Sequence, residues 1–502
     1  MIKPLRLKKQ HTPSFINALW SRDKKSRDKK PRAKEKNEAA VLFSRHSGTV
    51  RITLPENKTR ACTKVASHLI TLCALSLSAP VIQAETLDQA WQYALANNKQ
   101  LFAAEQGQLA AHEQLKMAKS TRLPALILSA NYVRVGSEPS IASEAYATLP
   151  GSPPDAPMIK TPFVMKISDK EILSYSAVAT LPIYTSGRIS ASIKAAESQA
   201  LASLDDKKQA ILDIKYAVAE AFIHVLQSTE GKHIANSHLE ALTSYRVDVS
   251  NLHTQGLVSR NDLLMADVAL ANAKQAAITV KNQGAIASAF YNQLLNRPLD
   301  TAFTLDHLTP EKQGELNIRA LTDKALEKRP ELSAFRNKIH ALNYDAKSIK
   351  AAALPQLALT ASYSNFDNRL LVDDHITTYG VNMVWPIFDG GVTRHRASQR
   401  QHQAAAVQAQ FDSFNDRVAL EVTQAWLNLN EAHERIKALS QVVEQAEENF
   451  KMTKNRYKEG LTNSTEVLEA AGLRRQSLGN HTNATYDASL AWIRLQRMTG
   501  EL

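Results

Sequence analysis

"LPALILSANY" (123–132) and "LPQLALTASY" (354–363) are two copies of one stretch, with six of ten positions identical. The offset of 231 residues continues upstream without gaps, from Ala94 and Leu95 to Ala325 and Leu326. Downstream the offset is 204 residues, which aligns "YSAVATLPIYTSG" (175–187) with "YGVNMVWPIFDGG" (379–391). The chain is therefore an internal duplication of 85–310 and 311–502, with one insertion of 27 residues between Tyr132 and Tyr175.

The quoted stretches alternate between apolar and small polar side chains, which is typical of β-strands. We expect strands at about 123–134, 172–183, 354–365 and 377–387. Strands of this length with one apolar and one small-polar face suit a transmembrane β-barrel around a wet lumen. The same alternation also fits a half-buried sheet in a soluble protein, and the pattern alone does not separate the two.

Four strands cannot close a barrel, and a lipid-exposed sheet edge is not tolerated. Several chains would have to contribute strands, and three chains would supply twelve. An aromatic girdle is expected where such a barrel meets the membrane surfaces. The aromatic residues in these segments are Tyr132, Tyr175, Tyr363, Tyr379 and Trp385.

Each repeat also contains one very long helical segment. Residues 188–255 and 392–459 each run for 68 residues without a proline. Flanking helices are expected near 86–121, 259–297, 318–352 and 463–497. Each half thus has the order helix, strand, strand, long helix, turn, helix. Such helices bury their apolar stripes by coiled-coil packing between neighbours, so the predicted fold class is mainly α with a β-barrel part.

The net charge of +12 comes from the N-terminal segment, where residues 1–84 hold 18 Lys and Arg against 5 Asp and Glu. The rest of the chain is nearly neutral, so it has no nucleic-acid signature. Residues 58–84 have the basic start, apolar run and small-residue end of a signal peptide. A retained anchor is disfavoured because the apolar run is shorter than about 18 residues. Residues 1–57 are basic and expected to be disordered.

Both cysteines, Cys62 and Cys73, lie in the segment that cleavage would remove. The mature chain would then contain no thiol chemistry and no disulfide.

Two similar turns separate the helices of each half, "TQGLVSRNDLLMA" (254–266) and "KEGLTNSTEVLEA" (458–470). Each turn has a glycine that can end a helix in the left-handed conformation, followed by a leucine. Ser259 with Asp262, and Asn463 with Glu466, have the spacing of a capping box. Capping explains Asp262 and Glu466 without any further role, whereas Glu469 is not needed by a cap.

No catalytic signature is present. His112-Glu113 and His433-Glu434 resemble the start of a zinc-protease motif, but positions 116 and 437 are lysines rather than the second histidine. Phosphate-binding and dinucleotide-binding loops are also missing from the sequence. We expect no enzyme activity, no cofactor and no metal site.

The duplicated order of elements, the "LP" before the strands, the closing "LPIYTSGR" and "WPIFDGGV", and the "G-L" turns together resemble the outer membrane efflux protein family, the TolC-like channels. The resemblance covers 85–502 and implies a homotrimer with a twelve-stranded barrel in the outer membrane. It also implies a long α-helical tube across the periplasm, which meets a periplasmic adaptor and an inner-membrane pump. By the same analogy, 134–170 is a long extracellular loop and 365–376 a short one.

The resemblance places the two turns at the narrow periplasmic end of the tube. By motif match, Glu466 and Glu469 would line its constriction, and Tyr457 and Asp262 would take part in polar links that hold it closed. Thr462 stands where a basic partner is expected, and Arg260 is the substitute we consider. The outer faces of the turns would contact the adaptor, and these residues are Gly256, Leu257, Val258, Ser259, Gly460, Leu461, Thr462, Asn463 and Ser464.

Three functions remain open from the sequence. The resemblance favours an exit duct for small molecules in a tripartite efflux pump. A type I secretion system for proteins or peptides would use the same duct. The third possibility is a periplasmic coiled-coil scaffold without a pore, which would leave the alternating strands unexplained.

Overall fold

A computed structural model describes residues 84–308, 317–367 and 373–502. The N-terminal extension, nearly all of the expected signal peptide and both cysteines lie outside the described residues. The first residues of the second repeat, up to 316, lie outside them as well.

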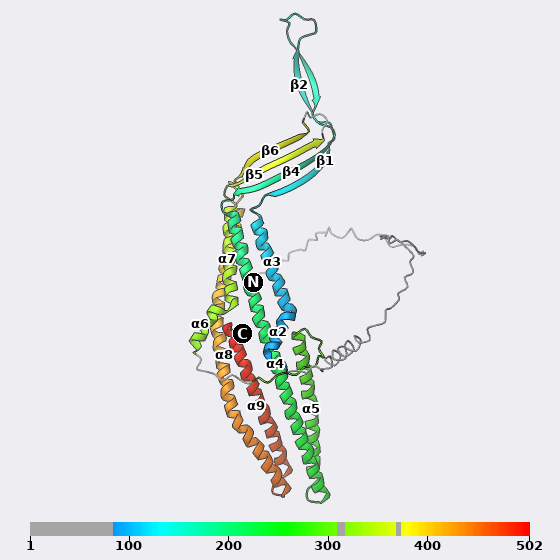
Figure 1. The fold of residues 1–502 in the computed structure, drawn as a ribbon, viewed down its shortest axis with the longest axis vertical. Helices are drawn as coiled ribbons and strands as arrows, with labels where there is room; N and C mark the ends of the chain where they lie inside the picture. Colours follow the sequence, from blue (N-terminus) through cyan, green and yellow to red (C-terminus); the bar gives the residue numbers. More distant parts are fainter. Residues whose placement is uncertain (1–83, 309–316, 368–372) are drawn as a thin grey trace, which may run out of the picture. The chain divides into compact units, whose positions relative to one another are not determined.

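The described chain is mostly helical, with β-strands in the middle of each repeat (Figure 1). The first repeat contains α2 (Leu87–Asn97), α3 (Lys99–Ser120), β1 (Ala125–Arg134), β2 (Ser140–Ala147), β3 (Ile159–Lys166), β4 (Glu171–Tyr184), α4 (Arg188–Thr254) and α5 (Arg260–Leu294). The second contains α6 (Ile318–Lys328), α7 (Pro330–Ala351), β5 (Gln356–Asp367), β6 (His375–Val384), α8 (Val392–Lys458) and α9 (Ser464–Thr499). The predicted fold class is confirmed.

The long helices α4 and α8 are each 67 residues, one residue shorter than the proline-free segments. Each begins after a left-handed glycine, Gly187 and Gly391, with φ of 85° and 86°. The turn at the other end of each helix leads into α5 or α9, which packs back along it (Figure 1).

The expectation of single flanking helices over 86–121 and 318–352 was wrong, because each is broken once. Asn98 has extended backbone angles, and its side chain accepts hydrogen bonds from the N–H groups of Gln100 and Leu101, starting α3. Arg329 is extended because Pro330 follows it, and the proline occupies the first turn of α7.

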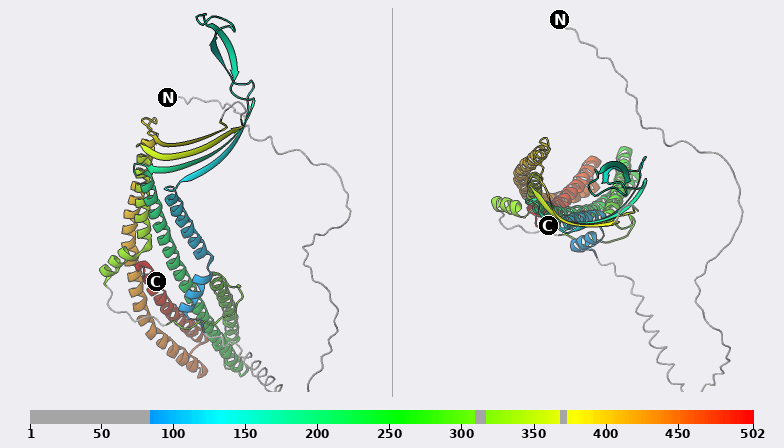
Figure 2. Two further views of the ribbon diagram at one scale, coloured as in Figure 1. Left: turned by 45° about the horizontal axis from the view of Figure 1, so that its top comes forward. Right: turned by 90° about the horizontal axis from the view of Figure 1, so that it is seen from above.

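The main sheet has the strand order β1-β4-β5-β6, with all neighbours antiparallel. It therefore joins the two repeats through β4 and β5. The sheet is curved (Figure 2), as a segment of a barrel would be. Strand β6 ends at Val384, three residues earlier than expected, since Pro386 cannot donate a ladder hydrogen bond.

The insertion of the first repeat is not an irregular loop. Residues 140–166 form a separate antiparallel hairpin of β2 and β3, paired from Ser140 with Lys166 to Ala147 with Ile159. Repeat comparison predicted the presence of the insertion but not its strands.

A hydrophobic core lies where α2, α4, α5 and α9 meet. Phe222 is fully buried there against Tyr291, with ring centroids 6.0 Å apart in an edge-to-face arrangement. The first described residues join the same region: Glu85 forms a bidentate ion pair with Arg297, with both N···O distances 2.9 Å. The long helices thus pack around a local core as well as in pairs.

A cluster of five charged residues, three of them buried, connects four helices beside this core. We call Asp213, Arg329, Glu331, Glu421 and Arg497 the charge cluster. Arg497 of α9 donates to Glu331 of α7 at 2.8 Å and to Asp213 of α4 at 2.5 and 2.9 Å. Arg329 donates to the same Glu331 at 3.2 Å and to Glu421 of α8 at 2.6 Å. Buried charges need partners of this kind, so the cluster fixes the positions of α4, α7, α8 and α9 relative to one another.

Candidate functional site

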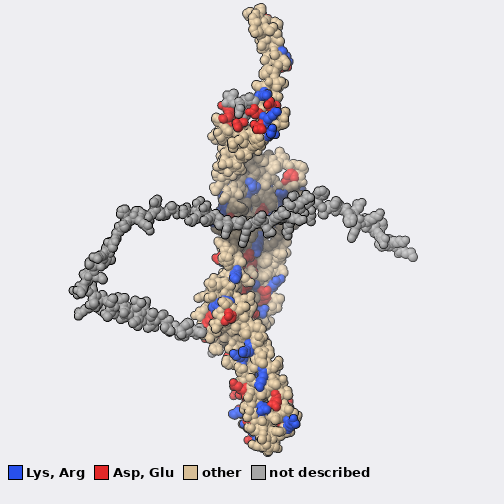
Figure 3. Space-filling model, turned by 90° about the vertical axis from the view of Figure 1, so that its right-hand side faces the viewer, with Lys and Arg blue, Asp and Glu red and all other residues tan. Residues whose placement is uncertain are grey.

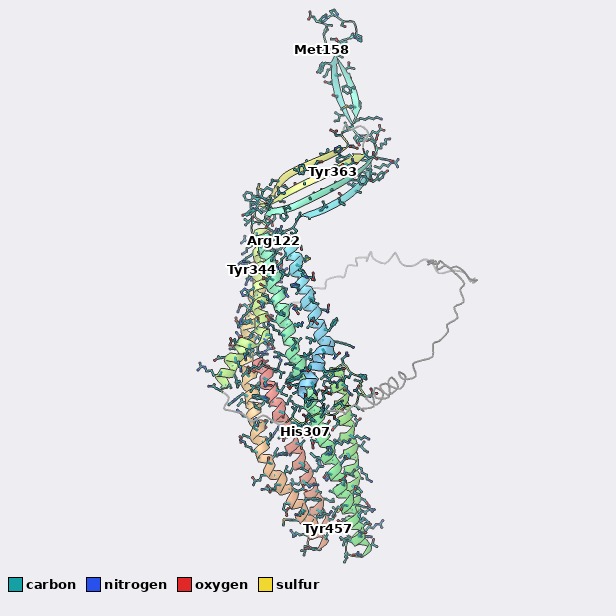
Figure 4. The ribbon with its side chains drawn as sticks, in the orientation of Figure 1. Arg122, Met158, His307, Tyr344, Tyr363 and Tyr457 are labelled. Carbon is teal, nitrogen blue, oxygen red and sulfur yellow. The ribbon has the colours of Figure 1, made fainter. Side chains whose placement is uncertain are left out.

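The two turns between long and short helices lie together, at the end of the helices away from the sheet (Figure 4). Gly256 and Gly460 have φ of 75° and 72°, as the sequence predicts for helix-ending glycines. The N–H of Leu257 donates to Leu252 O at 2.9 Å, and the N–H of Leu461 donates to Arg456 O at 2.8 Å. Both turns are therefore Schellman motifs, which end one helix within a few residues of the next.

The N-terminal cap of α5 is a full capping box. Asp262 N–H donates to the Ser259 hydroxyl at 3.2 Å, and Ser259 N–H donates to the Asp262 carboxylate at 3.1 Å. The side chain of Asp262 is therefore occupied within its own turn.

The cap of α9 differs from the expected box. Glu466 N–H donates to the Asn463 side chain at 3.0 Å, but the Glu466 carboxylate does not accept from the Asn463 backbone. It accepts instead from the side chains of Thr462 and Asn463. Thr462, which stands where a basic residue was expected, thus contacts one of the predicted constriction acids.

The two helical hairpins meet around a pair of tyrosines close to these turns. Tyr245 of α4 and Tyr457 of α8 are both buried, with ring centroids 5.4 Å apart (Tyr457 is labelled in Figure 4). The Tyr245 hydroxyl donates to the buried hydroxyl of Ser464 on α9 at 2.7 Å. Burial raises the pKa of both phenols, so both are neutral and can serve only as hydrogen-bonding groups.

An ion pair between α4 and α8 lies next to the tyrosines. Asp248 of α4 is 3.6 Å from Lys454 Nζ and 3.3 Å from Lys458 Nζ of α8. Lys454 also donates to the Ser244 hydroxyl at 3.3 Å. The sequence analysis missed Tyr245, Asp248 and both lysines. The spacing of four between Lys454 and Lys458, which puts both on one helix face, was the only available signal.

The predicted site residues are therefore partly brought together. Tyr457 contacts the other hairpin through the ring of Tyr245, and its hydroxyl has no hydrogen-bond partner in the described part of the chain. Arg260 was considered as the basic partner in place of Thr462. Among the described residues it makes no ion pair with the other turn, so it does not take that place within one chain. Glu469 is exposed and makes no hydrogen bond or ion pair in the described part of the chain.

Most of the predicted contact surface of the turns is exposed, but Val258 and Thr462 are half-buried and Ser464 is buried. Leu257 and Leu461 are 67% and 63% exposed, which is unusual for leucines that follow helix ends. Ser464, in contrast, is 1% exposed and lies under the turn surface.

The sheet carries two chemically different faces. The register places Leu128 beside Ala177, Ala179 beside Ala361, and Leu181 beside Leu359 on one face. On the other face the hydroxyls of Ser129 and Ser176 are 2.7 Å apart, and those of Ser362 and Thr378 are 2.6 Å apart. One face is thus mostly apolar, whereas the other carries the hydrogen-bonding hydroxyls together with a few apolar residues such as Ile127 and Val178.

The aromatic residues of the sheet lie at different levels along the strands. All five predicted girdle residues are exposed. Tyr132, Tyr175 and Tyr363 lie toward the strand ends away from the helices, and Trp385 follows β6 at the helix end. Tyr379 lies in the middle of β6, opposite Ala361. Exposed Tyr184 and Phe388 lie near the same helix end, and the sequence analysis overlooked them although both are in the repeated "LPIY" and "WPIF" segments.

The two fragments of a zinc-protease motif have ordinary structural roles. Lys116 Nζ pairs with Glu113 at 2.9 Å and Lys437 Nζ pairs with Glu434 at 2.6 Å, one helical turn apart. The described residues contain no group of three or more His, Cys, Asp or Glu that could hold a metal ion.

Comparison with known proteins gives a consistent picture. The family model described as outer membrane efflux protein matches residues 90–297 and 321–501. Outer membrane protein TolC of Escherichia coli is 24% identical over 453 residues, covering 86% of each chain. Outer membrane efflux protein BepC of Brucella suis is 23% identical over 391 residues, covering 76% of this chain and 77% of BepC.

Solved structures of low sequence identity show the same fold. The CmeC outer membrane channel of Campylobacter jejuni has a TM-score of 0.69 at 16% identity, covering 90% of this chain and 94% of that chain. The open-state MtrE outer membrane channel of Neisseria gonorrhoeae has a TM-score of 0.66 at 19% identity, covering 82% and 88%.

The fold, the two-faced sheet and a family match over both repeats agree. This chain belongs to the outer membrane efflux protein family, so it is a channel protein of the outer membrane and not an enzyme.

Proposed function

We propose that three copies of this chain form the outer membrane exit duct of a tripartite efflux pump for small molecules. The observation that carries the proposal is the incomplete sheet. Among the described residues, strands β1 and β6 each pair on one side only, and lipid does not tolerate such edges. If β6 of one copy pairs with β1 of the next, three copies close a barrel of twelve strands. The apolar face then meets lipid, and the hydroxyl-lined face surrounds the lumen.

The helices support the same trimer through two unpartnered apolar stripes. At 100° per residue, each stripe covers no more than about a third of its helix circumference. On α5 the exposed residues are Leu264, Val268, Ile278, Ile286 and Phe290. On α8 they are Leu420, Leu427, Val442 and Met452. In a closed ring the α5 stripe of one copy would pack against α8 of the next, which would bury both.

Helix α5 is also long and apolar enough to cross a membrane by itself. We assign its apolar surface to contacts between copies, because α4 runs beside it with Glu230, Lys232 and Glu240 in its sequence. A lipid-embedded helical hairpin would not carry that many charges.

The name of one relative favours export of small molecules over protein secretion. This relative is the pyoverdine export outer membrane protein OpmQ of Pseudomonas aeruginosa. It is 23% identical over 286 residues, which cover 55% of this chain. A periplasmic adaptor and an inner-membrane pump would deliver the substrate. The exposed turn residues Gly256, Leu257, Gly460, Leu461 and Asn463 are the surface we assign to the adaptor.

The turns of the second repeat would form the entrance of the duct. Three copies would bring together six carboxylates from Glu466 and Glu469, favouring cations over anions. The contacts of Tyr245 with Ser464, and of Asp248 with Lys454 and Lys458, would hold the two helical hairpins in one arrangement. Arg260, which is exposed and makes no ion pair in the described part of the chain, would then take part in opening through contacts between copies.

Two measurements test the proposal. The purified mature protein in detergent should have the mass of a trimer and should conduct ions in a planar bilayer. A monomer that stays soluble without detergent, or a trimer without conductance, would instead favour the scaffold. Export of a protein substrate but of no small molecule by cells that depend on this chain would assign it to type I secretion.

A third measurement tests the entrance. The double variant Glu466→Gln with Glu469→Gln should lose cation selectivity in single-channel recordings. Glu448→Gln in α8, which removes an exposed carboxylate away from the turn, is the control. Equal selectivity in both variants would place the constriction elsewhere.

A further inference from the structure

The hairpin of β2 and β3 carries an unpartnered apolar face. Because side chains alternate, Ile141, Ala145, Ile159, Phe163 and Met165 share one face of the ribbon. The large ones among them are 44–51% exposed. On the opposite face, Lys160 Nζ pairs with Glu144 at 2.5 Å. That opposite face also holds Lys166 and the exposed Val164 and Tyr146, whereas the face of Phe163 has no charged residue. The ribbon is therefore amphipathic through its charges, which all lie on one face.

The hairpin continues the strand pair of β1 and β4 after a short interruption. Val135 N–H donates to Lys170 O at 2.8 Å, and beyond the break Ile167 N–H donates to Pro139 O at 3.0 Å. Only 136–138 and 168–169 lie between these bonds. The hairpin is thus tethered by both of its strands and stays close to the end of the sheet from which it projects (Figure 1; Met158 at its far end is labelled in Figure 4).

Lipid is not a suitable cover for this face. Charged side chains gather between the apolar sheet and the hairpin (Figure 3). The strand ends nearest the hairpin carry the pairs of Arg134 with Glu171 and of Asp374 with His375. In a membrane protein such charges mark the limit of the hydrocarbon. The hairpin lies beyond them, and an isolated two-stranded ribbon with an open apolar face is marginally stable in water.

The hairpins of other copies of this chain could bury this apolar face. This step rests on the trimer of the proposed function. In that trimer each copy contributes one hairpin at the same end of the barrel, since the second repeat lacks the insertion. The hairpins are continuous with strands β1 and β4, and β1 forms the proposed contact between copies. We propose that the three hairpins pack their apolar faces together across the outer mouth of the barrel and form an extracellular lid.

The lid is tested by access to the lumen from outside, which does not depend on the periplasmic entrance. Residues 85–502, the expected mature chain, contain no cysteine, so Ser362→Cys on the hydroxyl-lined face of β5 would provide a single reporter thiol. Intact cells are treated either with a small charged thiol reagent or with a bulky polymer-linked maleimide. The small reagent should label the reporter in every background, because the lumen is wet.

Phe163→Asp places a charge on the apolar face of the hairpin, and Val164→Asp places the same charge one residue along on the other face. Phe163→Asp should raise the labelling rate with the bulky maleimide by about tenfold, equivalent to shifting the lid equilibrium by about 1.4 kcal/mol. Val164→Asp should leave that rate unchanged. Replacing 138–167 by a short glycine-serine loop, which needs no folded hairpin, should raise the rate at least as much.

The outcomes separate the lid from the channel itself. If the small reagent fails to label Ser362→Cys in a folded trimer, the hydroxyl-lined face is not a lumen and the proposed function fails. If the small reagent labels it but neither Phe163→Asp nor the loop replacement speeds labelling by the maleimide, the channel stands and the lid is refuted. Equal acceleration by Phe163→Asp and Val164→Asp would also refute it, because the apolar face would then have no special role.

Discussion

The charge cluster offers a sharp quantitative test of how the helices are held together. Arg497→Gln removes the buried guanidinium that links α9 to α7 and α4. The side chains of Arg497 and Glu331 are each 7% exposed, so their contact is a buried ion pair. The contact of Arg497 with Asp213 is different, since the Asp213 side chain is 52% exposed. The two carboxylates therefore contribute unequally to the free energy of unfolding.

Breaking a buried ion pair by removing one partner costs about 3–5 kcal/mol, because the remaining charge stays buried. Glu331 keeps its hydrogen bond from Arg329 at 3.2 Å, so we expect the lower end, about 3 kcal/mol, for Arg497→Gln. Asp213→Asn should cost about 1 kcal/mol or less, as is usual for solvent-exposed pairs. Arg494→Gln, the same substitution at an exposed position one turn earlier on α9, should change stability by less than about 0.5 kcal/mol.

The assay is urea unfolding of the detergent-solubilised protein followed by far-ultraviolet circular dichroism, with all variants at one protein concentration. Fixed concentration matters because the stability of an oligomer depends on it. If Arg497→Gln costs no more than Asp213→Asn, the buried contact with Glu331 does not hold the four helices and our reasoning is refuted.

Further predictions concern acidity, the turns and the tyrosine contact. Burial alone would raise the pKa of Glu331, but the hydrogen bond from Arg329 and the charge of Arg497 outweigh it and hold that pKa below the ordinary 4.5. A lowered folded-state pKa stabilises the fold above pH 4.5, and this stabilisation is lost as the pH falls through the folded-state pKa. The urea midpoints of unfolding of wild type and Glu331→Gln should therefore converge at acid pH. Gly460→Ala should destabilise the protein by about 1 kcal/mol, because Gly460 has a φ of 72° and alanine is strained in this left-handed conformation. Steric contact adds nothing, since a Cβ there would meet no atom within 4 Å. Gly472→Ala inside α9 should instead stabilise by up to about 1 kcal/mol in the same urea assay. Tyr245→Phe should cost about 1 kcal/mol by losing its hydrogen bond to Ser464, whereas a loss below about 0.3 kcal/mol would show that this contact does not join the hairpins.

The sequence by itself determined the features that depend on neighbouring residues. Alternation identified the four main strands, because residue spacing alone decides which strand face a side chain occupies. The absence of proline predicted α4 and α8 to within one residue. The glycines and caps of both turns followed from local backbone preferences, and the duplication set the order of the elements.

The sequence did not determine contacts between distant segments. The pairing of Tyr245 with Tyr457 and the ion pairs of Asp248 join residues about 200 positions apart, and no local spacing encodes such a meeting. The charge cluster likewise draws on α4, α7, α8 and α9. Asn463 and Glu466 have capping-box spacing, yet the Glu466 carboxylate turns to Thr462, because competing partners become visible only when the turn is folded. Tertiary structure also decided that the insertion pairs with itself as a hairpin, since strand pairing depends on which segments meet in space rather than on the pattern within either one.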